Sequence, residues 1–232
     1  MARTHSMNFE DSVRSGKFKS LEDAISYEFG YFVEYSKKLV ILNADSKHVT
    51  DQIVRSKSLV DKINLKDFKY KYTVEINKTH FEIENKIYNF EYLLPEETIY
   101  AILMSQKTTR YFGFDFDYKF DNFELPPGRS NFFKGIKNIN LIDSTYNANL
   151  DSIKVILAMY SKIKANHKKW LVIGDMLEQG RNEENEHKLL ANEINKYVFD
   201  NIILIGPRVL KYVKPSLKSK TFGFLNPKDV LG

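Results

Sequence analysis

A run of polar side chains follows a short apolar stretch in the second half of the chain. The apolar stretch is 139–142, and the polar run reads Asp143-Ser144-Thr145-Tyr146-Asn147-Ala148-Asn149. A strand that ends in these residues places several side-chain oxygens and amides at a sheet edge, where open α/β sheets bind ligands. Carboxylate and amide groups at a strand end can hold a polar ligand. The pattern predicts a binding site, with Asp143 as its first candidate.

A second strand-end motif follows in the sequence. It reads Gly174-Asp175-Met176-Leu177-Glu178 and comes directly after the apolar residues 171–173. The two motifs together resemble those of the Mur ligases, ATP-dependent enzymes that build the peptide of peptidoglycan. Their typical patterns are IDDSYNANPxSM and GDMxELG in the ligases of this family that add D-alanyl-D-alanine. The resemblance implies an amide ligase that uses ATP and Mg²⁺ and joins D-Ala-D-Ala to a UDP-muramoyl tripeptide.

The resemblance also implies roles for the first motif. Asp143 would take both hydroxyl groups of the ATP ribose, and Tyr146 would lie near the nucleotide. Asn147 would act near the acyl-phosphate as a catalytic and substrate-binding residue, and Asn149 would bind substrate. The alternative is a turn in which Asp143 caps backbone N–H groups and the asparagines open a helix.

Arg129 follows Pro127-Gly128 just before the first strand of the expected C-terminal domain. By resemblance this arginine reaches the ATP phosphates and serves both binding and catalysis, since a planar guanidinium can contact phosphate through two N–H groups. The alternative is a surface arginine in a linker.

Five further residues have candidate roles that come only from the resemblance. Asp175 and Glu178 would lie near the peptide substrate, or would cap a Gly-Asp turn. Asn43 and Asp45 would bind the nucleotide, with the Asn43 amide on the adenine edge, or would form a strand-end turn. His5 would help to hold Mg²⁺, or would be an unstructured terminal histidine. His187 is interpreted as structural.

The sequence departs from the family pattern in ways that bear on activity. Ser144 and Ser46 stand where the family has a second aspartate, and Leu150 replaces a proline. No G-x-x-x-x-G-K-[ST] loop, which would cradle phosphates, occurs in the chain. We therefore expect a piece of a longer enzyme that is inactive alone. The alternative is a non-catalytic relative that binds a nucleotide or a protein partner.

The elements that must position these residues alternate between helices and strands. In the first half, the spacing predicts a helix over 20–38 with Ser20 as its N-cap, a strand over 39–42, an antiparallel meander over 68–92 and a helix over 96–112. In the second half it predicts strands over 139–143, 169–174, 201–205 and 220–224, and helices over 150–164, 183–197 and 208–213. The resulting fold class is α/β. It combines a partial central ATPase domain over 1–125 with a Rossmann-like, parallel-sheet C-terminal domain over 126–232, truncated at its end.

Composition limits the classes of function. The 232 residues include no cysteine, which excludes disulfides and thiolate sites, and no run reaches the ~20 apolar residues of a membrane span. We expect a cytoplasmic protein without membrane insertion. The net charge of +5 suggests nucleic-acid binding, but acidic and basic residues are interleaved and no nucleic-acid motif occurs, so we expect no nucleic-acid partner. The sequence leaves the oligomeric state open.

Overall fold

The protein is described by a computed structural model, which covers residues 17–146, 148–164, 167–177, 179 and 182–230. The chain divides into two compact units. The first contains residues 1–72, 80–89 and 97–121, and the second contains 73–79, 90–96 and 122–232. That the predicted ranges 1–125 and 126–232 are the domains of a ligase stays a prediction.

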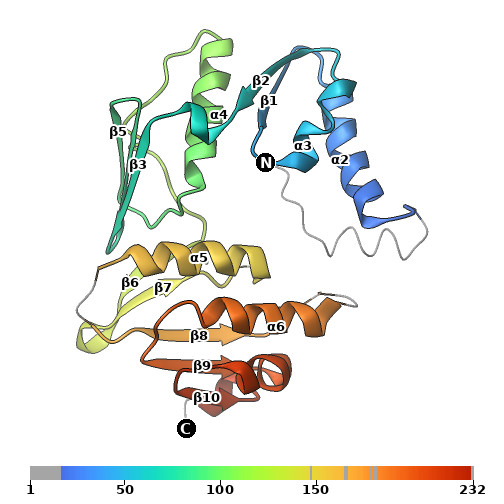
Figure 1. The fold of residues 1–232 in the computed structure, drawn as a ribbon. Coiled ribbons are helices and arrows are strands. Elements are labelled where there is room, and N and C mark those ends of the chain that lie inside the picture. Colours follow the sequence, from blue (N-terminus) through green and yellow to red (C-terminus); the bar gives the residue numbers. More distant parts are fainter. Residues whose placement is uncertain (1–16, 147, 165–166, 178, 180–181, 231–232) are drawn as a thin grey trace. The chain divides into compact units, whose positions relative to one another are not determined.

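In its described residues, the first unit contains a two-stranded parallel sheet and three α-helices. Its strands are β1 (Leu39–Asn43) and β2 (Leu59–Ile63), and its helices are α2 (Leu21–Tyr35), α3 (Lys47–Thr50) and α4 (Thr98–Tyr111) (Figure 1). The Ser20 side chain accepts a 3.1 Å hydrogen bond from the Asp23 N–H, so the predicted N-cap of α2 is confirmed. One face of α2 packs on β1 through Val33, Val40 and Leu42. The sequence did not predict β2.

Three consecutive strands form the predicted meander. They are β3 (Tyr70–Glu75), β4 (Lys78–Ile83) and β5 (Lys86–Phe90), in the sheet order β3-β4-β5. Each turn contains residues with positive φ, namely Asn77 at 61° and then Glu84 at 49° and Asn85 at 64°. Such backbone matches the twist of tight hairpins, which explains why asparagine occupies both turns.

The long segment of the second unit, 122–232, contains a hairpin followed by parallel strands. The hairpin pairs β6 (Asn131–Lys134) with β7 (Asn140–Asp143), and β7 is the strand predicted over 139–143. The parallel sheet has the order β10-β9-β8, formed by β8 (Trp170–Gly174), β9 (Asn201–Ile205) and β10 (Thr221–Phe224). Its helices are α5 (Leu150–Lys162), α6 (Glu183–Ile194) and a π-helical turn over Val209–Val213. The predicted α/β class is confirmed, with antiparallel β6 as an unpredicted partner of β7.

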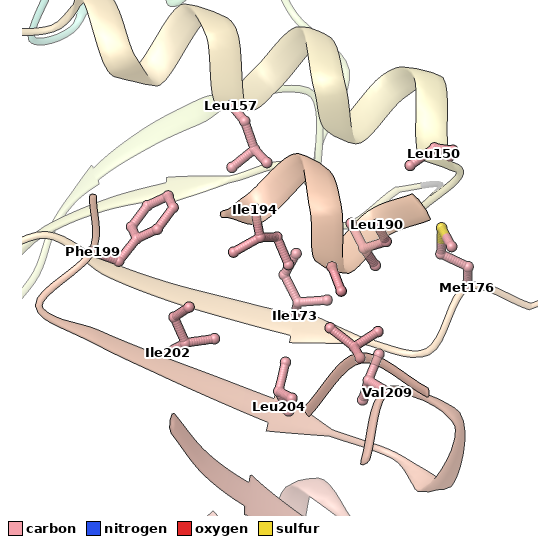
Figure 2. Close-up of a cluster of buried hydrophobic side chains, with 12 residues drawn as sticks. Leu150, Leu157, Ile173, Met176, Leu190, Ile194, Phe199, Ile202, Leu204 and Val209 are labelled. Carbon is pink, nitrogen blue, oxygen red and sulfur yellow. The ribbon is translucent and has the colours of Figure 1, made fainter. Parts of the chain in front are cut away.

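A buried cluster connects helices α5 and α6 with strands β8 and β9 (Figure 2). Leu157 of α5 and Leu190 and Ile194 of α6 lie over Ile173 of β8 and over strand β9. Because both helices lay apolar residues on the sheet, the strand ends and the loops that follow them are held in place. Short 3₁₀ turns complete the described chain at Ile53–Arg55, Leu65–Asp67, Ile136–Asn138, Lys214–Ser216 and Pro227–Val230. No helix in the described part of the chain is long and apolar enough to cross a membrane.

Candidate active site

The β6–β7 hairpin brings together two candidate residues that are seventeen positions apart in the sequence, Arg129 and Tyr146. Asn131 pairs with Asp143 in the register of the hairpin, so the segment before β6 lies beside the segment after β7. The Tyr146 N–H donates a 3.2 Å hydrogen bond to the Gly128 carbonyl. The Arg129 guanidinium carbon lies 4.1 Å from the centroid of the Tyr146 ring, a cation–π contact.

Gly128 permits this close approach. Its φ is +70°, and a Cβ atom at this position would lie 2.9 Å from the Tyr146 nitrogen. Only glycine adopts this backbone readily and leaves that space open. The sequence pattern Pro-Gly-Arg therefore has a structural reason, because Gly128 lets Arg129 reach Tyr146.

Asp143 has the turn-capping contact that the sequence offered as one alternative, and its contact with a ribose stays a prediction. Its Oδ1 accepts a 3.0 Å hydrogen bond from the Thr145 N–H and so caps the turn after β7. No described residue donates a hydrogen bond to its Oδ2. One oxygen of the carboxylate therefore holds the loop, and the other can accept from the hydroxyl group of a ligand.

Asn149 is the N-cap residue of α5. Its Oδ1 accepts a 2.9 Å hydrogen bond from the Ser152 N–H, and the Asn149 N–H donates to the Ser152 hydroxyl at 3.2 Å. This reciprocal pair is a capping box. The contacts support the helix-opening alternative for Asn149, and its predicted role in binding substrate stays a prediction.

Asp175, at the end of β8, is held by residues that follow β9. Its Oδ1 accepts a 2.8 Å hydrogen bond from the Val209 N–H, and its Oδ2 lies 3.4 Å from Nη1 of Arg208. The Arg208 Nε donates a 2.5 Å hydrogen bond to Glu183, which raises the pKa of the guanidinium. The Asp175 side chain is 9% exposed. This arrangement supports the capping alternative, and no motif in the sequence pointed to Arg208 as its partner.

His187 lies buried beneath the same strand end. Its Nε2 accepts a 3.2 Å hydrogen bond from the Met176 N–H. Its Nδ1 lies 2.7 Å from the Glu183 carbonyl and donates to it in the neutral tautomer that these two contacts require. Both ring nitrogens are therefore satisfied within the fold, in line with the structural interpretation of this residue.

Comparison with known proteins connects this geometry to one family. Residues 128–220 match the family described as Mur ligase, glutamate ligase domain. This part of the chain is therefore similar to the C-terminal domain of the Mur ligases. Comparison with curated proteins finds no match.

Solved Mur ligases share the fold over nearly the whole chain. MurF from Acinetobacter baumannii is 17% identical with a TM-score of 0.78, and the match covers 93% of this chain and 49% of that one. MurF from Thermotoga maritima, solved in complex with ADP, is 19% identical with a TM-score of 0.72. This match covers 92% of this chain and 50% of that one. Folylpolyglutamate synthase from Thermotoga maritima is 14% identical with a TM-score of 0.59, covering 92% and 52%. The chain thus spans about half the length of the solved ligases it matches.

Two candidate residues lie outside the matched range 128–220, in the first unit. Asn43 Oδ1 accepts a 2.9 Å hydrogen bond from the Asp45 N–H. The Asp45 Oδ2 accepts from the Leu65 N–H at 2.9 Å and from the Tyr100 hydroxyl at 2.6 Å. These hydrogen bonds, led by that of Tyr100, lower the pKa of Asp45. Both side chains therefore have structural partners within the first unit, and their contact with a nucleotide stays a prediction.

The remaining candidates cannot be placed. His5, Asn147 and Glu178 lie outside the described residues. Within the described part of the chain, no group of three or more His, Cys, Asp or Glu side chains could hold a metal ion.

Proposed function

We propose that this chain is part of an ATP-dependent amide ligase of the MurF type, which joins D-Ala-D-Ala to a UDP-muramoyl tripeptide and releases ADP and phosphate. The observation that carries the proposal is the contact between Arg129 and Tyr146 beside Asp143, within the Mur ligase domain. The likeness to MurF from two bacteria supports it. A cytoplasmic location belongs to the same proposal.

The side chains of this site fit part of a nucleotide. The Arg129 side chain is exposed, and no described residue accepts a hydrogen bond from its guanidinium. Its N–H groups can therefore bind phosphate oxygens. The open Oδ2 of Asp143 is an acceptor suited to ribose hydroxyls. When bound, ATP supplies the phosphoryl group that activates the tripeptide carboxylate toward the amine of D-Ala-D-Ala.

Two roles follow for residues of this chain. Arg129 binds phosphate oxygens and stabilises the negative charge that develops on them during transfer. Asp143 orients the nucleotide through its open oxygen while its other oxygen keeps the loop in place.

Calorimetric titration of the purified chain with Mg-ATP, and separately with ADP, tests the proposal. We expect binding that weakens about tenfold in Asp143→Ala and in Arg129→Ala, since a hydrogen bond to a charged group contributes about 1.5 kcal/mol or more. Lys134→Ala is the matched control, because Lys134 is exposed at the opposite end of β6. Binding that both site variants leave unchanged, or no binding at all, would contradict a nucleotide site here.

A second candidate is a non-catalytic relative that binds a nucleotide or a partner. Ser46 and Ser144 in place of aspartate favour it, as do the hydrogen bonds within the first unit that occupy Asn43 and Asp45. The genomic sequence upstream of Met1 separates the two candidates, because an in-frame Gly-Lys-Thr loop would support the ligase. The chain alone is expected to be inactive, and ADP release by the purified chain with both substrates would refute that expectation.

A further inference from the structure

Helix α2 presents aromatic side chains on a face that the described structure leaves open. Tyr31 and Tyr35 stack with their ring centroids 4.4 Å apart, and Tyr27 lies 6.0 Å from Tyr31. Their exposed fractions are 53%, 62% and 48%, and that of Phe32 is 64%. A shallow groove of about 470 Å³ runs along this face, which we call the aromatic face, and is lined by Tyr27, Glu28, Tyr31, Phe32, Tyr35 and Ser36.

The opposite side of the same helix is already buried. Ala24, Phe29 and Val33 are between 0% and 9% exposed, and Val33 packs on β1. A helix that needs only to cover a sheet has one apolar stripe and a polar outer face. Because α2 is apolar on both sides, its aromatic face has the character of an interface.

The charge of α2 indicates what this interface would accept. The helix has four acidic residues and no lysine or arginine, whereas the whole chain has a net charge of +5. Glu28 lies in the groove among the rings, and no described lysine or arginine pairs with it. Aromatic rings beside a carboxylate favour a lysine or arginine side chain, by cation–π attraction and by ion pairing.

The dimensions of the aromatic face favour a polypeptide. From Tyr27 to Tyr35 the helix rises about 12 Å, which matches two turns of a partner helix. Regular spacing of rings along one helix is suited to side chains at i and i+4 of an amphipathic segment. We propose that the aromatic face of α2 binds an apolar polypeptide segment carrying a lysine or arginine that pairs with Glu28.

A fluorescently labelled amphipathic peptide of leucine and lysine is the probe, titrated with the purified chain and followed by anisotropy. We expect saturable binding that weakens at least about tenfold in Phe32→Ser, because truncation of a central interface aromatic has large effects. Glu28→Gln should weaken binding of the leucine–lysine peptide but not of a leucine–glutamine peptide. Val198→Ser is the matched control, since Val198 is 89% exposed and lies in the second unit.

The outcomes that overturn the proposal are specific. They are no binding of the leucine–lysine peptide, or equal binding by wild type and the α2 variants. Analytical ultracentrifugation tests a third such outcome. If the chain self-associates and Phe32→Ser abolishes the self-association, the occupant of the aromatic face is a second copy of the chain. Circular dichroism checks folding, and Tyr35→Ser replaces Phe32→Ser if that variant unfolds. The peptide test does not involve Arg129 or Asp143, so its result is separate from that of the nucleotide titration.

Discussion

The Tyr100 hydroxyl donates a 2.6 Å hydrogen bond to Oδ2 of Asp45. Tyr100 belongs to α4 and Asp45 to the loop after β1, so the bond ties a helix to a strand end fifty-five positions earlier in the chain. This hydrogen bond lowers the pKa of Asp45. The pKa of Tyr100 is raised, mainly by burial and next by its hydrogen bond to Asp45. Because folding favours the charged form of the Asp45 carboxylate, this charge contributes to the stability of the first unit.

Tyr100→Phe should remove this contribution in a pH-dependent way. An aspartate whose pKa is lowered on folding stabilises the protein above its unfolded pKa of about 3.9, and the effect is lost as pH falls through the folded pKa. We expect the free energy of unfolding to fall by about 1 kcal/mol at neutral pH, because Asp45 is exposed, and by much less in acid. Urea denaturation at both pH values measures it. Tyr111→Phe, on the exposed side of the same helix, is the control. An equal loss at both pH values would argue against a contribution from the hydrogen bond between Tyr100 and the charged Asp45 carboxylate.

Gly128→Ala and Gly113→Ala form a matched pair. Both glycines have positive φ, +70° and +73°, but a Cβ at Gly113 meets no atom within 4 Å, whereas at Gly128 it meets the Tyr146 nitrogen. We expect Gly113→Ala to cost about 1 kcal/mol from backbone strain alone. Gly128→Ala should cost more and should also weaken Mg-ATP binding, because Tyr146 must move. Urea denaturation and calorimetry test both effects, and indistinguishable variants would show that the contact between Gly128 and Tyr146 is unimportant.

Asn149→Ala should reduce stability through the loss of the N-cap of α5. The expected loss is about 1 kcal/mol, the usual value for an N-cap replaced by alanine. Asn149→Asp should retain most of the stability, because aspartate caps equally well. Thermal unfolding compares the two variants. If Asn149→Ala instead weakened Mg-ATP binding and left stability unchanged, the side chain would act on the ligand and not as a cap.

His187→Ala should be the most destabilising of these changes. It leaves a cavity and removes the partners of the Met176 N–H and the Glu183 carbonyl, so we expect a loss of about 3 kcal/mol. Leu189, on the same helix, is 41% exposed. The Leu189→Ala variant should change the free energy of unfolding by about 0.5 kcal/mol or less. Urea midpoints of the two variants test the difference. A His187→Ala variant as stable as Leu189→Ala would contradict a structural role for the histidine.

Elements with strong local signals were predictable from the sequence. Ser20 caps α2 as expected, because an N-cap depends only on residues within one turn. The strand over 201–205 and the meander follow from apolar and alternating patterns. Strands β2 and β6 were missed, because Leu59–Ile63 is only partly buried and Asn131–Lys134 is too short for a clear period. Both are strands because a neighbouring strand pairs with them.

The sequence by itself determined the α/β class, the order of most elements and the two strand-end motifs that resemble Mur ligases. Only the tertiary structure decided which polar groups remain open to a ligand. Asp175 and Asp45 find partners thirty-four and twenty positions away, at Val209 and Leu65, whereas Asp143 keeps one oxygen open. A carboxylate is available for binding only when the folded chain leaves it without enough donors. Sequence motifs place carboxylates at strand ends, but the packing of distant segments determines those donors.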